Sequence, residues 1–389
     1  MESVSFAQSP QISLAANQDN MTQSDALIRT MSAPPGIASP LWNLSNVGER
    51  RDLLNQSNLI AQAVPNPQPG PARPAPQPLS GSPLGTFSDS TVDGFWIGES
   101  SGGVRRAYDP STTSLGSVPA IRPDARFART GGSVIFVNGI ANTQAQAANA
   151  GQLIANKTGG DVRVLYNASQ GWNDVPRAAG DNFSTFGVNF QPPARALGNT
   201  IYHSARNGQT LHIMSNSHGS TLTRNALYVA RDQLLKEYGY REMQLPGLEH
   251  DLNRDAYFKQ LQTNNDAVIK ANAALSNIKV ETFGAAVGNF DIAGPKYLHW
   301  VNTNDPVVQA AGIDYQGNAA KIGSLNPGAN SVVVRFTSGT NGDIKAHYLE
   351  TYIPTRVNTG GFDQIYNRNS GNNGNGSPSI VDLPGTRLN

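Results

Sequence analysis

The amino-acid sequence predicts an α/β fold in which helices cover both faces of a mostly parallel sheet. From residue 131 onward, short apolar runs rich in β-branched residues alternate with longer segments whose apolar residues recur at helical spacing. This alternation is typical of parallel strands that are joined by crossover helices. Ligand sites of such sheets lie at the carboxyl ends of the strands, so reactive residues are expected directly after strands.

Six apolar runs are the expected strands of this sheet. They occupy residues 133–140, 161–169, 209–215, 277–284, 296–302 and 331–338. The first run, SVIFVNGI, is apolar and β-branched until it stops at Asn-Gly, which is typical of a buried strand.

Three helices are expected between the earlier strands, and they lie within residues 141–160, 195–208 and 218–237. Asn142 or Thr143 can cap the start of the first helix, and Gly159 with Gly160 can end it. The third helix carries an apolar stripe made of Leu222, Ala226, Leu227, Ala230 and Leu234.

The stretch 239–276 interrupts this alternation directly after the third helix. It is longer than an ordinary connection between a helix and a strand, and a further helix is expected around 255–275. Such an insertion beside a site can act as a lid or cap, but an extra surface helix explains it equally well.

The two ends of the chain have a different composition. Residues 1–85 are rich in Ser, Gln and Pro and predict a disordered arm, within which 64–83 is an extended linker or a proline-rich ligand for a partner domain. Residues 86–130 are a linker or docking segment, in which the apolar GFWIGES (94–100) can join the sheet as an edge element. The low-complexity stretch 358–389 predicts a disordered tail, which leaves 131–357 as the α/β domain.

Composition excludes several classes of function. The chain of 389 residues has a net charge of +1, which provides no electrostatic basis for binding nucleic acid or an anionic membrane. It has no cysteine, so disulfides, thiolate catalysis and cysteine-ligated zinc are excluded. The first 20 residues lack the features of a Sec signal, and no apolar run is long enough to span a membrane. A cytoplasmic location and export without a Sec signal both remain open.

The segment SNSHG (215–219) lies where the strand 209–215 meets the helix 218–237. A nucleophilic serine at such an elbow requires small residues two positions before and after it, and Ser217 has Ser215 and Gly219 there. The first N–H groups of the helix would face an oxyanion that develops beside this serine. The alternative is a polar turn in which the serine only caps the helix.

An acid and a base follow in the order that a Ser-Asp-His site requires. Asp305 lies a few residues beyond the strand 296–302, although an Asp before Pro can also form a simple Asx-turn. His347 follows the strand 331–338 in a loop or at the start of a short helix. Because each of the three residues follows a different strand, we expect them to meet at one edge of the sheet.

The remaining histidines and motifs indicate no second chemistry. His212 and His299 lie within predicted strands and His203 within a helix, where structural roles are expected, while His250 lies in the insertion. No HExxH, GxGxxG or GxxxxGK[ST] motif is present, so neither a metal nor a nucleotide cofactor is expected.

Residues 131–353 resemble an α/β-hydrolase of the lipase and serine-esterase kind. The resemblance is carried by FVNGIANT, HIMSNSHGS, ETFGAAV, HWVNTNDPVV and AHYLETY. It implies that Ser217 is the nucleophile, Asp305 the acid and His347 the base, and that the N–H groups of Ile140 and His218 form the oxyanion hole. The sequence departs from G-x-S-x-G at Ser215, and Asn216 replaces a common histidine.

By this resemblance the chain cleaves a carboxylic ester through an acyl-enzyme, without a cofactor. The substrate would be a small-molecule or lipid ester, which leaves peripheral membrane contact open. The second hypothesis is a catalytically weak or inactive hydrolase-like domain that serves as a binding or effector module. A third is that the same triad cuts peptides or transfers acyl groups. The N-terminal arm also resembles the unfolded leader of bacterial proteins exported by a type III apparatus, which would make the chain an effector with a host protein as partner.

Overall fold

The structure is a computed structural model that describes residues 89–100, 103–125, 127, 131–140, 142–168, 191–240, 254–288, 290–311, 327–328, 331–370 and 378–383. The predicted disordered arm, its proline-rich linker and His250 lie outside these residues.

The described strands form one sheet with the order β2-β1-β4-β3-β5-β6-β7-β8-β9. Every neighbouring pair from β4 to β9 is parallel, whereas β1 pairs antiparallel with both β2 and β4. The strands are β1 (Trp96–Glu99), β2 (Arg105–Tyr108), β3 (Val134–Val137), β4 (Val162–Leu165), β5 (Leu211–Asn216), β6 (Ile278–Phe283), β7 (Lys296–Asn302), β8 (Val332–Phe336) and β9 (Ser379–Asp382). The predicted α/β-hydrolase-like sheet is therefore confirmed.

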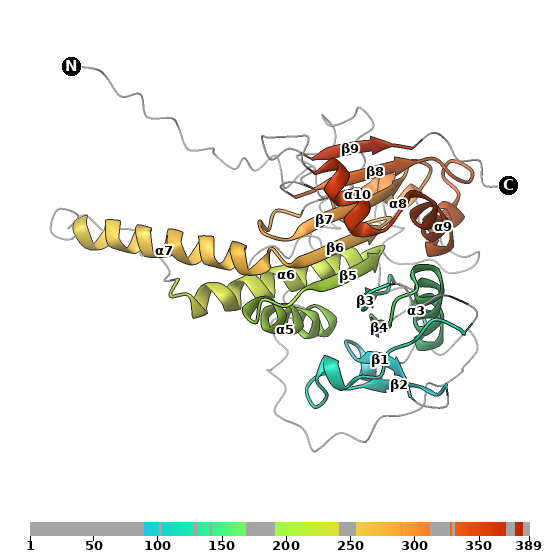
Figure 1. The fold of residues 1–389 in the computed structure, drawn as a ribbon, viewed down its shortest axis with the longest axis horizontal. Helices are drawn as coiled ribbons and strands as arrows, with labels where there is room; N and C mark the ends of the chain where they lie inside the picture. Colours follow the sequence, from blue (N-terminus) through green and yellow to red (C-terminus); the bar gives the residue numbers. More distant parts are fainter. Residues whose placement is uncertain are drawn as a thin grey trace, which may run out of the picture.

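Helices cover both faces of this sheet (Figure 1). They are α3 (Gln144–Thr158), α5 (Pro192–Arg206), α6 (His218–Glu237), α7 (Arg254–Leu275), α8 (Pro306–Ala311), α9 (Leu349–Thr359) and α10 (Phe362–Asn369). The short 3₁₀ helices are η2 (Asp89–Val92), η3 (Leu115–Ser117) and η6 (Ile344–His347). Alternate residues of β3 divide between two apolar clusters, one with α5, α6 and α7 and the other with α3, α9 and α10.

The predicted start and end of the first helix are correct. Thr143 caps α3, since its side chain accepts from the Gln146 N–H while the Gln146 side chain accepts from the Thr143 N–H. Gly159 ends the helix in the left-handed conformation, at a φ of 68°. The helix predicted around 255–275 is present as α7, whose buried Ala271 and Leu275 pack on the core. Its role as a lid stays a prediction.

The N-terminal border of the sheet differs from the prediction. GFWIGES was expected at an edge, but β1 lies between β2 and β4, and β2 forms the edge. Trp96 packs in one apolar cluster and Ile97 in the other, so β1 is covered on both faces. A strand with both faces buried fits the interior of the sheet better than its edge.

The C-terminal border also requires a correction. The stretch from Asn358 was predicted to be disordered, yet it contains the end of α9, the whole of α10, and β9, which pairs with β8 in parallel. The α10 residues Phe362, Ile365 and Tyr366 have the i, i+3, i+4 spacing of a buried helix face. The helix spans only eight residues and is followed directly by the low-complexity stretch, so composition alone did not predict it.

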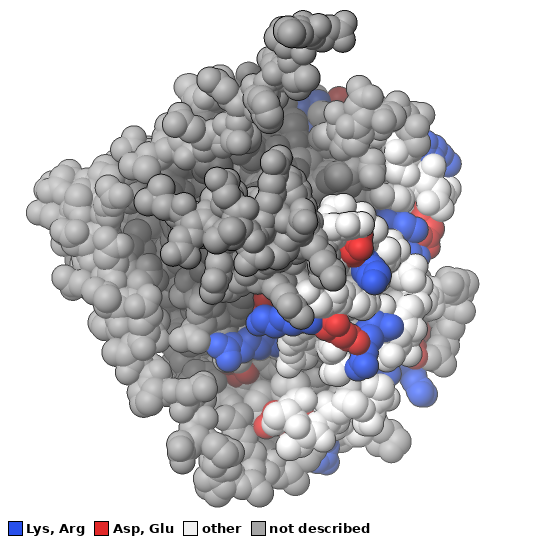
Figure 2. Space-filling view, turned by 90° about the vertical axis from the view of Figure 1, so that its left-hand side faces the viewer, with Lys and Arg blue, Asp and Glu red and all other residues white. Residues whose placement is uncertain are grey.

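The described surface carries charges of both signs. Figure 2 shows lysines and arginines interspersed with aspartates and glutamates over the described part of one face, which agrees with the net charge of +1. None of the described helices is long and apolar enough to cross a membrane.

Candidate active site

Ser217 lies at a strained join between β5 and α6. Its φ of 55° and ψ of −130° make it the only described residue other than glycine with a positive φ. Such a conformation costs about 1–3 kcal/mol and persists only where the surroundings enforce it. The end of β6 does so, because the Ser217 N–H donates to Phe283 O at 3.0 Å and the Ala286 N–H donates to Ser217 O at 3.3 Å.

The helix-cap alternative for Ser217 has little support from this geometry. A capping serine normally has an unstrained extended backbone and accepts a hydrogen bond from the first turn of the helix. Ser217 precedes α6, but its side chain makes no capping hydrogen bond. The side chain is 6% exposed, so the hydroxyl group is held in a largely enclosed position without serving the helix.

The two positions flanking the elbow meet the predicted steric requirement in different ways. A Cβ on Gly219 would lie 2.4 Å from Val137 O and 2.8 Å from Asn138 O, so only glycine lets α6 approach the end of β3 this closely. Ser215 is completely buried and donates its hydroxyl hydrogen to Ser220 Oγ at 3.3 Å. The serine that departs from the G-x-S-x-G pattern is therefore accommodated by a hydrogen bond.

Asp305 and His347 form a buried pair at the carboxyl ends of β7 and β8. His347 Nδ1 lies 2.7 Å from Asp305 Oδ2, with Asp305 fully buried and His347 9% exposed. The other oxygen, Oδ1, accepts from the N–H groups of Val307 at 2.8 Å and Val308 at 3.2 Å. The Asx-turn that was the alternative role for Asp305 therefore exists on one oxygen, while the second oxygen holds the imidazole.

The remaining imidazole nitrogen of His347 is suited to act as a base. An ionised carboxylate can only accept, so the proton of the neutral ring lies on Nδ1 and Nε2 carries the lone pair. This Nε2 is buried and has no hydrogen-bond partner within the described part of the chain. It follows that Ser217 Oγ and His347 Nε2 are not hydrogen-bonded to each other in this structure.

The stretch 283–286, which begins at the last residue of β6, contacts both halves of the site. Phe283 and Ala286 hold the backbone of Ser217. A Cβ on Gly284, whose φ is +54°, would lie 2.7 Å from Asp305 Oδ2 and 3.0 Å from His347 Nδ1. The segment thus lies directly against the serine elbow on one side and the Asp-His pair on the other.

The predicted oxyanion residues flank the serine. A Cβ on Gly139 would lie 2.9 Å from Ser217 Cβ, so the loop that carries the partly buried Ile140 begins directly against the elbow. Gly139 O accepts from Asn138 Nδ2 at 2.8 Å and Asn142 Nδ2 at 3.2 Å. The carbonyl and N–H of a trans peptide point in opposite directions, so these amides turn the Ile140 N–H away from themselves.

His218, the second predicted oxyanion residue, is the first residue of α6 and is almost fully buried. Its ring Nδ1 accepts from Asn167 Nδ2 at 3.2 Å, which ties the start of the helix to the end of β4. The N–H groups of the first turn point out of the N-terminus of α6, where they favour negative charge.

The strand histidines have the structural roles that were expected. His299 lies 2.8 Å from both Thr282 Oγ1 and Pro327 O, and its burial lowers its pKa to about 4. His212 Nε2 lies 2.9 Å from Glu281 Oε2. Among the described residues, no three His, Asp or Glu side chains gather as the ligands of a metal ion.

Two contributors to the site escaped the sequence interpretation. Tyr352 of α9 donates to Asp305 Oδ2 at 2.5 Å, and Gly284 provides the space in which the Asp-His pair lies. Both lie in segments that carry the resemblance, Gly284 in ETFGAAV and Tyr352 in AHYLETY, but neither residue was assigned a role there. The only signal for Tyr352 is its position five residues after His347.

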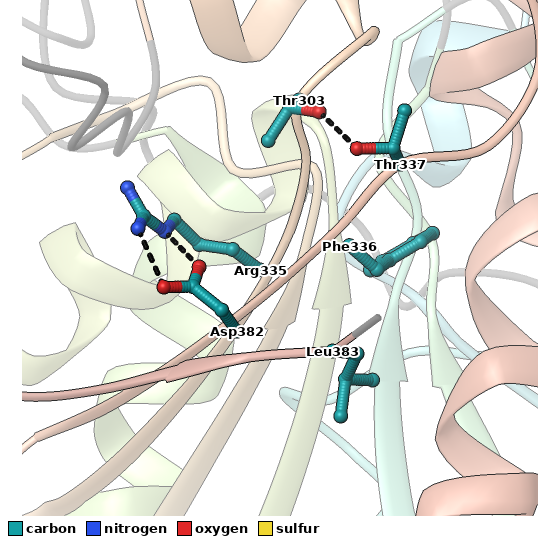
Figure 3. Close-up of a pocket in the computed structure, with 6 residues that line it drawn as sticks. All are labelled: Thr303, Arg335, Phe336, Thr337, Asp382 and Leu383. Carbon is teal, nitrogen blue, oxygen red and sulfur yellow. Dashed lines mark hydrogen bonds and ion pairs between the residues drawn. The ribbon is translucent and has the colours of Figure 1, made fainter. Parts of the chain in front are cut away.

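A separate polar pocket of about 300 Å³ lies beside the ends of β8 and β9 (Figure 3). It is lined by Thr303, Arg335, Phe336, Thr337, Asp382 and Leu383 and contains none of the predicted site residues. Two hydrogen bonds of 2.7 and 2.8 Å pair the guanidinium of Arg335 with the carboxylate of Asp382. The pair carries no net charge.

Comparison with known proteins yields no family model that matches the chain and no match among curated proteins. Two solved structures of a thermophilic esterase, Est2 from the Planctomycetes species Thermogutta terrifontis, share a distant likeness. The butyrate-bound form has a TM-score of 0.23 and 11% identity and covers 71% of this chain and 82% of the esterase. The native form has a TM-score of 0.22 and 12% identity and covers 68% of this chain and 75% of the esterase.

Proposed function

We propose that this protein is a serine hydrolase that cleaves a carboxylic ester through an acyl-enzyme. The observation that carries the proposal is the backbone of Ser217, which is strained at the join of β5 and α6 without serving as a helix cap. The hydrogen-bonded Asp305–His347 pair at the same edge of the sheet supports it. The distant esterase likeness adds no weight to it.

In this mechanism Ser217 Oγ attacks the ester carbonyl carbon while His347 Nε2 takes the hydroxyl proton. Asp305 holds the imidazole in the required tautomer and stabilises its positive form. The N–H groups of Ile140 and His218 stabilise the oxyanion, each by about 3 kcal/mol. When the tetrahedral intermediate collapses, the bond to the alcohol breaks and His347 returns the proton to the leaving oxygen.

Deacylation repeats these steps with water as the nucleophile. His347 removes a proton from the water as its oxygen attacks the acyl carbon, and the second intermediate releases the acid and restores Ser217. The contact between Ser217 and His347 that both stages require has to form when substrate binds. Catalytic hydrogen bonds are often long or misaligned in a free enzyme and tighten only in its complexes.

The competing candidate is a hydrolase-like binding module without activity. The observation in its favour is that no hydrogen bond joins Ser217 to His347. The two candidates differ in the nucleophilicity of the serine, because a serine without a base does not react at an appreciable rate.

Labelling with a fluorophosphonate probe separates the two candidates. We expect the probe to modify wild-type protein at Ser217 and not to modify Ser217→Ala.

The rate at which the Ser217→Ala variant hydrolyses a short p-nitrophenyl ester should fall by at least a thousandfold, on the order of the cost of removing a triad member. Its circular dichroism spectrum should be unchanged. Ser204→Ala is the matched control, because it removes a buried serine hydroxyl group of α5 that lies outside the elbow. Turnover in Ser217→Ala equal to that of the wild type excludes the hydrolase proposal.

Export through the N-terminal arm is a separate proposal that rests on composition alone. Fusion of residues 1–80 to a reporter in a bacterium with a type III apparatus tests it. We expect secretion of the reporter if the arm is a leader, and retention identifies it as a tail of a cytoplasmic protein.

A further inference from the structure

The proposed mechanism does not use Tyr352, although this residue makes a direct contact with the proposed acid. Tyr352 lies on α9 and is completely buried. Its hydroxyl group donates to Asp305 Oδ2 at 2.5 Å, the same oxygen that lies 2.7 Å from His347 Nδ1. A tyrosine and a histidine therefore share one lone-pair-bearing oxygen of the carboxylate.

The direction of the tyrosine hydrogen bond is determined by a second contact. The backbone N–H of Asn302 donates to Tyr352 Oη at 3.3 Å, so the hydroxyl oxygen is an acceptor there and its hydrogen is directed to Asp305. Burial and the neighbouring charge of Asp305 raise the pKa of Tyr352 well above its ordinary value. The phenol therefore stays protonated and remains a donor.

Asp305 then accepts four hydrogen bonds. Two come from the N–H groups of Val307 and Val308 to Oδ1, and two come from Tyr352 and His347 to Oδ2. Both carboxylate oxygens are held from two directions, so the carboxylate cannot rotate. The Tyr352 hydroxyl group holds Oδ2 in the position where it accepts from the imidazole. It also withdraws part of the negative charge from Oδ2.

We infer that Tyr352 is a positioning residue for the base, acting through Asp305. It holds Oδ2 in line with His347 Nδ1–H and limits how strongly the carboxylate binds the imidazolium, so that His347 can return its proton to the leaving alcohol. The inference rests on the proposed serine-hydrolase function. It concerns the strength and geometry of one hydrogen bond, which can be measured even without turnover.

The test compares Tyr352→Phe with Tyr297→Phe. Tyr297 is also completely buried and donates to a single acceptor, Ile292 O at 2.7 Å, but it contacts no residue of the site. Both changes therefore remove one buried hydroxyl group that makes a hydrogen bond. For Tyr352→Phe we expect kcat for a p-nitrophenyl ester to fall about tenfold to a hundredfold, on the order of a lost hydrogen bond to a charged group, with little change in KM. Tyr297→Phe should leave both constants unchanged.

A spectroscopic measurement separates positioning from a general loss of structure. The Nδ1–H proton of His347 should give a downfield proton resonance, because its hydrogen bond to a carboxylate is short. Removing the competing donor in Tyr352→Phe should strengthen that bond and move the resonance further downfield. A fluorinated tyrosine at 352 keeps the shape and the hydroxyl group but is a stronger donor, so it should move the resonance upfield. Tyr297→Phe should not move it.

The outcomes distinguish this inference from the proposed function. A wild-type protein that neither reacts with fluorophosphonate nor hydrolyses an ester contradicts the hydrolase function, while the resonance still reports on the contact of Tyr352 with Asp305. An active wild type whose Tyr352→Phe variant has the same kcat and the same resonance overturns the inference alone. Equal losses in both phenylalanine variants also overturn it, because they indicate a structural role only.

Discussion

Two buried carboxylates, Glu281 within β6 and Asp305 beyond the end of β7, differ in what neutralises them. Each is fully buried, each is hydrogen-bonded to a histidine, and each is contacted from α9. The α9 contacts come from Arg356 and Tyr352, which are four residues apart and therefore lie on the same face of the helix. The same helix thus supplies a cation to one carboxylate and a neutral donor to the other.

The charge of Glu281 is compensated by Arg356 of α9 and by two side chains of the sheet. Arg356 contacts it at 2.7 and 3.2 Å, Trp300 Nε1 donates to it at 2.9 Å, and His212 Nε2 lies at 2.9 Å. Burial by itself raises the pKa of Glu281, but the charge of Arg356 and the contacts with His212 outweigh that effect and lower the pKa to about 2. Glu281 lies inside β6, where nothing can bind, so its role is structural.

Asp305 lies beyond the end of β7 and has no permanent cation among the groups that hydrogen-bond to it. Its charge is balanced by neutral donors and by an imidazole whose other nitrogen is left without a partner among the described residues. A permanent cation therefore makes a buried carboxylate inert, whereas a titratable partner at the end of a strand makes it available for chemistry.

Loss of the Asp305 charge should reduce activity far more than loss of the Glu281 charge. Asp305→Asn should lower kcat on the order of 10⁴-fold, because an amide favours the wrong imidazole tautomer while keeping its shape. Steady-state hydrolysis of a p-nitrophenyl ester measures this change. Glu281→Gln is the matched control, as it makes the same acid-to-amide change in the other buried carboxylate. A similar fall in kcat for both variants would contradict the division of roles.

The second effect concerns stability and is expected at Glu281. Arg356→Met removes the cation and leaves a buried charge unpaired, which should lower the free energy of unfolding by about 3–5 kcal/mol. Urea unfolding followed by circular dichroism measures the loss. Adding Glu281→Gln to this variant removes the unpaired charge and should restore much of the stability. If the double variant is less stable than Arg356→Met alone, Arg356 is not the group that compensates the charge of Glu281.

The third effect is the pH dependence that Glu281 contributes. Its folded pKa of about 2 lies below its ordinary value of 4.5, so the stabilisation is fully present above pH 4.5 and is lost as the pH falls towards 2. The slope from this one group is at most about 1.4 kcal/mol per pH unit. Urea unfolding at several pH values across that window measures the slope. In the double variant Glu281→Gln with Arg356→Met, the free energy of unfolding should depend less steeply on pH. An unchanged slope would show that Glu281 does not have a lowered pKa in the folded protein.

Much of the architecture could be predicted because it depends on local patterns. The helix 218–237 was predicted with the bounds that α6 has, and α3 is capped by Thr143 and Gly159, which are among the residues expected at its two ends. The borders of the sheet were less predictable. Whether β1 lies at an edge depends on its neighbours in space, and the pairing of β9 with β8 joins segments more than 40 residues apart.

The alternation of strands and helices follows from local sequence patterns that repeat over a few residues, and so does the position of Ser217, Asp305 and His347, each beyond a different strand. Which side chains touch depends on the three-dimensional packing. The Asp305–His347 pair spans 42 residues and the Arg356–Glu281 pair 75 residues, and no local period encodes such contacts. The strain at Ser217 is likewise tertiary in origin, because it is the packing of β6 against the elbow that holds the backbone in this conformation.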